Sequence, residues 1–174
     1  MKIKYIIFIL FLSLSSFSKS YSIEPDVFVQ STVNKASSVL SSEISLEKKI
    51  SELKLIAKDT VDIKGIGFYT LGSARKTLND EQKKKYAELF EQYFLKSFSS
   101  RLAEYTNPEI SVEGKKVLSE KYTIVNSLLK ATKERPEIKI DWRIYTKDPN
   151  NPLIRDLIIE GLSLARTQKE EFQS

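Results

Sequence analysis

The side chains that perform most nucleophilic and metal chemistry are missing from this sequence. It contains no His and no Cys in its 174 residues, which excludes Ser-His-Asp and Cys-His triads as well as His/Cys zinc sites. A pair of carboxylates alone can support glycosidase-like chemistry, and the few acids in candidate strands include Asp141, Asp156 and Glu160. Alternation places Asp141 away from the core and puts Asp156 and Glu160 on one face of the final strand, as solvated or capping charges. We therefore expect no catalytic residues, no enzyme, no metal and no cofactor.

Aromatic rings are the most distinctive side chains that remain. Six of them recur at helical spacing from Tyr86 to Tyr105, with Phe90, Phe94 and Phe98 between them, so they share one face of a candidate helix. A face of large rings either fills an ordinary core or lines a wide apolar cavity that binds a ligand. Periodicity does not distinguish these two interpretations, and both stay open at this point.

The periodicity of apolar residues changes near Pro108, from that of helices to that of strands. Before it, apolar residues follow a helical period, most clearly over residues 46–57, which indicates amphipathic helices. Asn79 and Gln82 have the spacing of a capping box and begin the aromatic helix. We expect helices over about residues 24–106.

After Pro108 the apolar period changes to two, which indicates strands. The clearest runs are Tyr122, Ile124, Asn126 and Leu128, and then Ile140, Trp142 and Ile144. Short connections join the expected strands over about residues 108–165, which favours an antiparallel meander. The predicted fold class is α+β, with an N-terminal helical layer packed on a twisted four-stranded antiparallel sheet and the start of a short C-terminal helix.

The N-terminus has the pattern of a Sec-type signal peptide. Lys2 and Lys4 precede an apolar run over residues 5–14 and a Ser-rich stretch that ends at Ser22. The apolar run is too short to span a bilayer, which needs about 20 residues. We expect cleavage after residue 22 and a single exported domain over residues 23–174.

The formal charge of +5 does not indicate a nucleic-acid partner. Lys2, Lys4 and Lys19 lie in the expected signal peptide, so the 28 basic residues fall to 25, against 23 acidic ones. The cluster at residues 83–85 falls in the first turns of an amphipathic helix, where such charges usually form a solvated face. We therefore expect no nucleic acid among the partners.

Several segments, in order, resemble one known family. They are Leu71-Gly72-Ser73-Ala74-Arg75 with the Gln and aromatic residues after it, Trp142-Arg143-Ile144, the stretch from Asp156 to Leu164, and Phe172. Over about residues 24–172 the sequence is similar to the MlaC family of periplasmic phospholipid carriers. It departs from the family at Pro152 and Arg155, where an aromatic residue is usual. Family members also generally continue past the final Phe, so we expect either that the fold tolerates this difference or that the cavity is more open.

The resemblance implies a periplasmic carrier that shuttles phospholipid between an inner-membrane ABC lipid transporter complex and an outer-membrane lipoprotein complex, to maintain outer-membrane lipid asymmetry. It places two acyl chains between helices and sheet, in a cavity near the top of the usual range, about 1,000 Å³. The residues expected to bind lipid are Tyr86, Phe90, Tyr93, Phe94, Phe98, Ile140, Trp142 and Ile144.

Few headgroup contacts are expected, and Arg75 and Arg155 are the candidates for them. The competing interpretation is that both make surface ion pairs, which are worth under about 1 kcal/mol. Two other functions also stay open. One is a carrier of another apolar ligand, such as a sterol-like compound, and the other is an adaptor with a filled core that binds no lipid.

Overall fold

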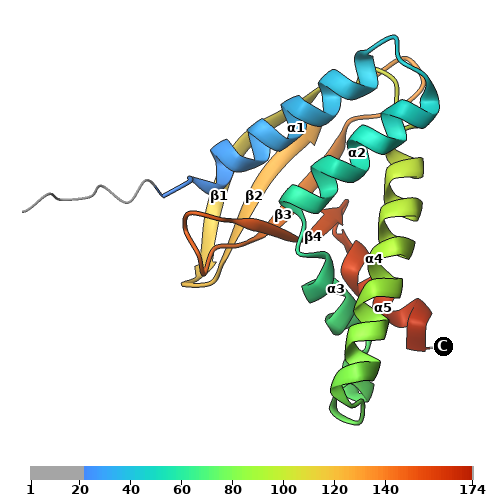
Figure 1. Ribbon diagram of the computed structural model, residues 1–174. Coiled ribbons are helices and arrows are strands. Elements are labelled where there is room, and N and C mark those ends of the chain that lie inside the picture. The colour runs from blue at the N-terminus through green and yellow to red at the C-terminus, as the bar shows by residue number, and fades with distance from the viewer. Residues whose placement is uncertain (1–21, 174) are drawn as a thin grey trace, which may run out of the picture.

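The computed structural model describes residues 22–173, in which helices precede strands as the sequence predicts (Figure 1). The expected signal peptide falls, apart from Ser22, outside the described residues. The elements are α1 (Pro25–Ser41), α2 (Leu46–Thr60), α3 (Ile63–Thr70), the 3-10 helix η1 (Gly72–Lys76), α4 (Asp80–Leu102), β1 (Ile110–Ser119), β2 (Tyr122–Leu129), β3 (Ile138–Tyr145), β4 (Leu153–Ile159), β5 (Leu162–Ser163) and α5 (Leu164–Gln173). No helix in the described part is both long and apolar enough to cross a bilayer.

Side-chain caps fix where α3 and α4 begin. The Asp62 carboxylate accepts a hydrogen bond from the backbone N–H of Gly65 at 2.8 Å at the start of α3. The capping box of α4 is confirmed, because the Asn79 side chain accepts from the Gln82 backbone at 2.8 Å and the Gln82 side chain accepts from the Asn79 backbone at 2.9 Å. Each cap satisfies N–H groups that have no partner within the helix.

The strands form an antiparallel meander in the order β1-β2-β3-β4-β5, one strand more than predicted. The single final strand expected from Asp156 onward is wrong, because the chain turns back at Glu160 and Gly161. Their φ angles are 49° and 82°, and a two-residue type I′ hairpin turn requires positive φ at both positions. As a result, Asp156 is buried in β4 whereas Glu160 is exposed in the turn, so the two acids do not share a strand face.

The buried face of β2 is also the opposite of the one predicted. Thr123, Val125, Ser127 and Leu129 are buried, while the residues between them are half-buried. Hydrogen bonds explain the difference: the Ser127 hydroxyl accepts from the Trp142 indole N–H at 2.8 Å and donates to the Ile140 carbonyl at 3.0 Å. A hydroxyl with both bonds made is readily buried. The alternation predicted for β3 is confirmed.

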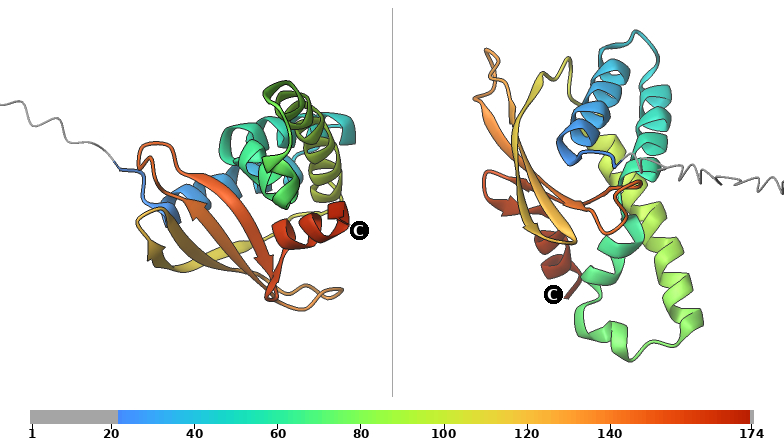
Figure 2. Two further views of the ribbon diagram at one scale, coloured as in Figure 1. Left: turned by 90° about the horizontal axis from the view of Figure 1, so that it is seen from below. Right: turned by 90° about the vertical axis from the view of Figure 1, so that its left-hand side faces the viewer.

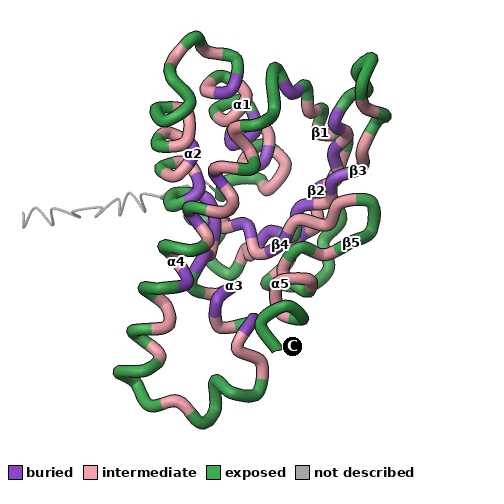
Figure 3. The backbone as a smooth tube through the Cα atoms, turned by 90° about the vertical axis from the view of Figure 1, so that its right-hand side faces the viewer, coloured by how far each residue is buried: buried purple, intermediate pink, exposed green. Residues whose placement is uncertain are grey.

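The helices and the sheet form two layers that meet at particular places (Figure 2). Helix α1 packs on β1 and β2, while α2 and α4 pack on each other. The segment between α2 and α3 contacts β4, where Val61 forms a bridge with Ile154 and the Asp62 N–H donates to the Ile154 carbonyl at 2.9 Å. Helix α5 packs on both α3 and β4. Figure 3 shows the buried residues gathered between the layers and an exposed segment between α3 and α4.

Helices α3 and α4 approach closely because α3 carries Gly67 at the contact. A Cβ atom added to Gly67 would lie 2.7 Å from the ring of Phe90, which is only 3% exposed. Real Cβ atoms do not approach a ring that closely, so the ring occupies the space that a side chain would need.

We expect Gly67→Ala to lower the free energy of unfolding by about 1–3 kcal/mol, because the added methyl group overpacks the contact with Phe90. An ordinary Gly→Ala change inside a helix would instead stabilise by about 1 kcal/mol. Urea unfolding measures the difference. Gly114→Ala in β1 is the matched control, since a Cβ atom there meets nothing within 4 Å. A Gly67→Ala variant as stable as the wild type would contradict this packing.

An ion-pair cluster joins the start of α1 to β1. The Lys115 ammonium donates to Asp26 at 2.7 Å and also to Glu24. The hydrogen bond from Lys115 lowers the pKa of Asp26, and the hydrogen bonds to Asp26 and Glu24 raise the pKa of Lys115. The three side chains are partly exposed, so we expect the cluster to contribute under about 1 kcal/mol.

Because the pKa of Asp26 is lower in the folded state than in the unfolded state, the ion pair stabilises the protein at pH values above the unfolded pKa of Asp, which is about 3.9. This stabilisation is lost as the pH falls through the folded-state pKa. Lys115→Gln should therefore reduce the free energy of unfolding at neutral pH, and its difference from the wild type should disappear on acidification. Urea titrations across that pH range measure the effect. The exposed neighbour Lys116 supplies the control, Lys116→Gln, and an equal effect of both changes would contradict the assignment.

Candidate functional site

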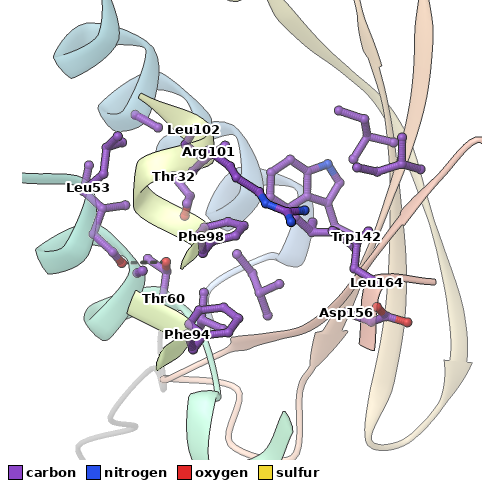
Figure 4. Close-up of a pocket in the computed structure, with 18 of the residues that line it drawn as sticks. Thr32, Leu53, Thr60, Phe94, Phe98, Arg101, Leu102, Trp142, Asp156 and Leu164 are labelled. Atoms are coloured by element: carbon purple, nitrogen blue, oxygen red, sulfur yellow. Dashed lines mark hydrogen bonds between the residues drawn. The ribbon is translucent and has the colours of Figure 1, made fainter. Parts of the chain in front are cut away.

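An apolar cavity of about 430 Å³ lies between the helical layer and the sheet. Side chains from α1, α2 and α4 form one wall, side chains from β2, β3 and β4 form the other, and α5 lines one end (Figure 4). Prominent apolar members are Val33, Leu53, Phe94, Phe98, Ile140 and Trp142. The aromatic face of α4 therefore belongs in part to the core and in part to the wall of this cavity.

Five of the eight residues expected to bind lipid line this cavity. They are Tyr93, Phe94, Phe98, Ile140 and Trp142. The rings of Phe94 and Phe98 stack with centroids 5.2 Å apart and form the α4 wall. On the facing wall the Trp142 indole N–H already donates to Ser127, so the ring needs no polar partner from a ligand.

The other three, Tyr86, Phe90 and Ile144, belong to the core around the cavity. Phe90 packs against α3 and lies 6.0 Å from the ring of Phe172, centroid to centroid. The Tyr86 hydroxyl shares a hydrogen bond of 2.7 Å with the buried Thr70 hydroxyl. Ile144 is fully buried in the sheet. Periodicity identified the correct face but not the point along it where core gives way to cavity.

The polar groups in the wall are mostly satisfied within the protein. Thr32 and Thr60 donate to backbone carbonyls one helical turn earlier, at 2.9 and 2.7 Å. Asp156, which is 5% exposed, accepts from the Ser163 hydroxyl at 2.6 Å and from the Ala165 N–H at 3.0 Å. Its carboxylate therefore caps the first turn of α5, in agreement with the capping role considered for it. Walls of this kind suit an apolar ligand.

The two arginines expected near a headgroup lie outside the lining. Arg75 is exposed in η1. Arg155 is ion-paired with Asp62, and its guanidinium lies 4.5 Å from the centroid of the Tyr145 ring. For Arg155 the geometry supports the competing interpretation, an ion pair. It gives no support to a headgroup role for Arg75.

Two charged members of the cavity wall do not follow from the sequence analysis, Arg101 on α4 and Glu171 on α5. Arg101 follows Phe98 by three residues and Phe94 by seven, so it shares their helical face. The apolar periodicity that defines this face does not include a charged residue. The contribution of α5, through Leu164 and Gln168, has no comparable local signal.

The cavity is less than half the expected size of about 1,000 Å³. It still lies within the usual range of ligand pockets, about 300–1,000 Å³. Helix α5 contributes to its lining through Leu164, Ala165 and Gln168.

Comparison with known proteins places this geometry in a family. The family model for the MlaC protein matches residues 30–174. The phospholipid-binding protein from Ralstonia solanacearum, solved in complex with a phospholipid, has the same fold, with a TM-score of 0.72. The two sequences are 18% identical, and the match covers 87% of this chain and 86% of that chain. No curated protein matches the sequence. Because the family match extends over most of its length, the chain belongs to the MlaC family.

Proposed function

We propose that the protein is a phospholipid carrier that holds acyl chains in the cavity between helices and sheet. The observation that carries the proposal is the apolar cavity, with Phe94 and Phe98 on one wall and Ile140 and Trp142 on the other. Membership of the MlaC family and the phospholipid in the Ralstonia solanacearum structure support it. The lipid-binding role of these side chains is part of the proposal.

The physical need for a carrier comes from the cost of exposing acyl chains to water. That cost is about 0.8 kcal/mol per methylene, so two chains of roughly 16 carbons would cost on the order of 25 kcal/mol. A lipid therefore crosses an aqueous compartment only inside an apolar cavity. Because such a cavity is hardly better for the lipid than a bilayer, membrane complexes must drive loading and release.

We propose that the compartment is the periplasm and that the protein reaches it through a cleaved signal peptide over residues 1–22. The partners would be an inner-membrane ABC lipid transporter complex and an outer-membrane lipoprotein complex, and the outcome would be maintained outer-membrane lipid asymmetry. These statements follow from the signal-peptide pattern and the family resemblance. The proposed function is binding and transport, and it involves no enzymatic reaction.

The alternative within the same class is a carrier of another, smaller apolar ligand, such as a sterol-like compound. It is supported by a cavity of about 430 Å³ that lies in the lower part of the usual range of ligand pockets, about 300–1,000 Å³. Lipid extraction and mass spectrometry of the purified protein separate a diacyl phospholipid from a single-chain or sterol-like ligand. An adaptor with a filled core would yield no ligand at all.

Phe94→Asp should reduce the lipid that copurifies with the protein by at least about tenfold, because a carboxylate placed among apolar chains costs several kcal/mol. Leu89→Asp is the matched control on the same helix, since Leu89 is 51% exposed and is not among the cavity-lining residues. Phosphate analysis and mass spectrometry of extracted lipid measure the occupancy. Full phospholipid occupancy in a folded Phe94→Asp variant would refute the assignment of this helix face.

A second test fills the cavity without adding charge. Ala36 lines the cavity from α1, so Ala36→Trp should leave a folded protein that carries much less lipid, because the indole occupies the ligand's space. Ser38→Trp on the exposed side of α1 should retain the lipid. Equal lipid content in both variants would place the ligand elsewhere.

The export proposal has its own test. We expect the N-terminus of the exported protein to be Ile23 or within a few residues of it, as read by N-terminal sequencing or intact mass. Full-length protein embedded in the inner membrane would show that the segment is not a cleaved signal peptide.

A further inference from the structure

Arg101 is the one basic side chain that lines the cavity among the described residues. It lies in the last two turns of α4 and is exposed, whereas Phe94 and Phe98 on the same face are half-buried. Figure 4 shows its side chain extending from α4 toward the strand that carries Trp142. The methylene groups of an Arg side chain in this position cover the apolar wall. Its guanidinium stays near solvent.

The Arg101 guanidinium has no ion pair, hydrogen bond or ring contact with any residue of the described range 22–173. Its five N–H donors are therefore available to a ligand. Two acids also line the cavity. Asp156 is committed to Ser163 and Ala165, and Glu171 accepts from the Gln168 amide at 2.9 Å.

We propose that Arg101 binds the anionic group of the lipid whose chain occupies the cavity. This inference rests on the proposed function and adds a polar subsite to it. A chain seated against Phe94 and Phe98 ends near Arg101, because the three residues follow one another along the same helical face. A guanidinium presents two parallel N–H donors to a phosphate or a carboxylate. The ligand is thus an acyl chain with a negative group, either the phosphate of a phospholipid or the carboxylate of a free fatty acid.

The experiment compares three probes that share the oleoyl chain: dioleoylphosphatidylglycerol, oleate and uncharged dioleoylglycerol. Each is presented to the purified, delipidated protein on its own, as an aqueous dispersion without any other lipid, and the bound probe is quantified after the dispersion is removed. Arg101→Gln removes the charge, and Arg101→Lys keeps it. The control Arg143→Gln makes the same change at an exposed residue of β3 that does not line the cavity.

Arg101→Gln should weaken binding of the anionic probe by about tenfold or more, the usual effect of losing charge-assisted hydrogen bonds. Binding of dioleoylglycerol should change by less than about twofold, since that probe has no charge for Arg101 to contact. Arg101→Lys should retain part of the affinity, and Arg143→Gln should retain nearly all of it. A loss confined to phosphatidylglycerol identifies the phosphate, and a loss confined to oleate identifies the carboxylate.

An equal loss for charged and uncharged probes, or no loss at all, would overturn the role of Arg101 while leaving the carrier function intact. The same loss in Arg143→Gln would also overturn it, because the effect would then come from overall charge. If the wild type takes up none of the three probes, the proposed function itself fails and the Arg101 subsite fails with it.

Discussion

An apolar cavity collapses unless its walls are held apart at their edges, since apolar side chains otherwise pack to the density of a crystal. The contacts between the two layers meet this constraint. Helix α1 rests on β1 and β2, the bridge between Val61 and Ile154 fixes the segment after α2, and α5 packs between α3 and β4. The carboxylate of Asp156 holds the first turn of α5 in place. With the edges fixed, the rings of α4 line a cavity and do not merge with the sheet.

Single elements contain both core residues and residues that line the cavity. On α4, Phe90 packs against Gly67 and completes the core, while Phe94, one turn later, faces the cavity. On β3, Ile144 is fully buried and Trp142 lines the cavity with its indole N–H satisfied by Ser127. The packing that stabilises the fold therefore also shapes the wall of the cavity.

Local signals explain what could be predicted from the sequence. Helix periodicity, the capping box of α4 and the alternation of β3 depend on neighbouring residues, and the structure confirms them. The turn at Glu160 and Gly161 has no clear signal in the sequence, because Glu is an uncommon residue at positive φ. The burial of Ser127 depends on hydrogen bonds with β3, which the sequence of β2 alone does not show. Arg101 lies on the face of Phe94 and Phe98, but a charged residue does not belong to an apolar period.

In the proposed function, acyl chains occupy the space beside Trp142, which is the one Trp of the sequence. Bromine atoms on an acyl chain quench indole fluorescence only at short range, so phospholipids brominated at different chain positions report where the chain lies. We expect strong quenching of Trp142 that depends on the position of the bromine and is abolished in Ala36→Phe, which fills the cavity without adding an indole. Stoichiometric binding of brominated lipid with unchanged Trp142 fluorescence would contradict the account.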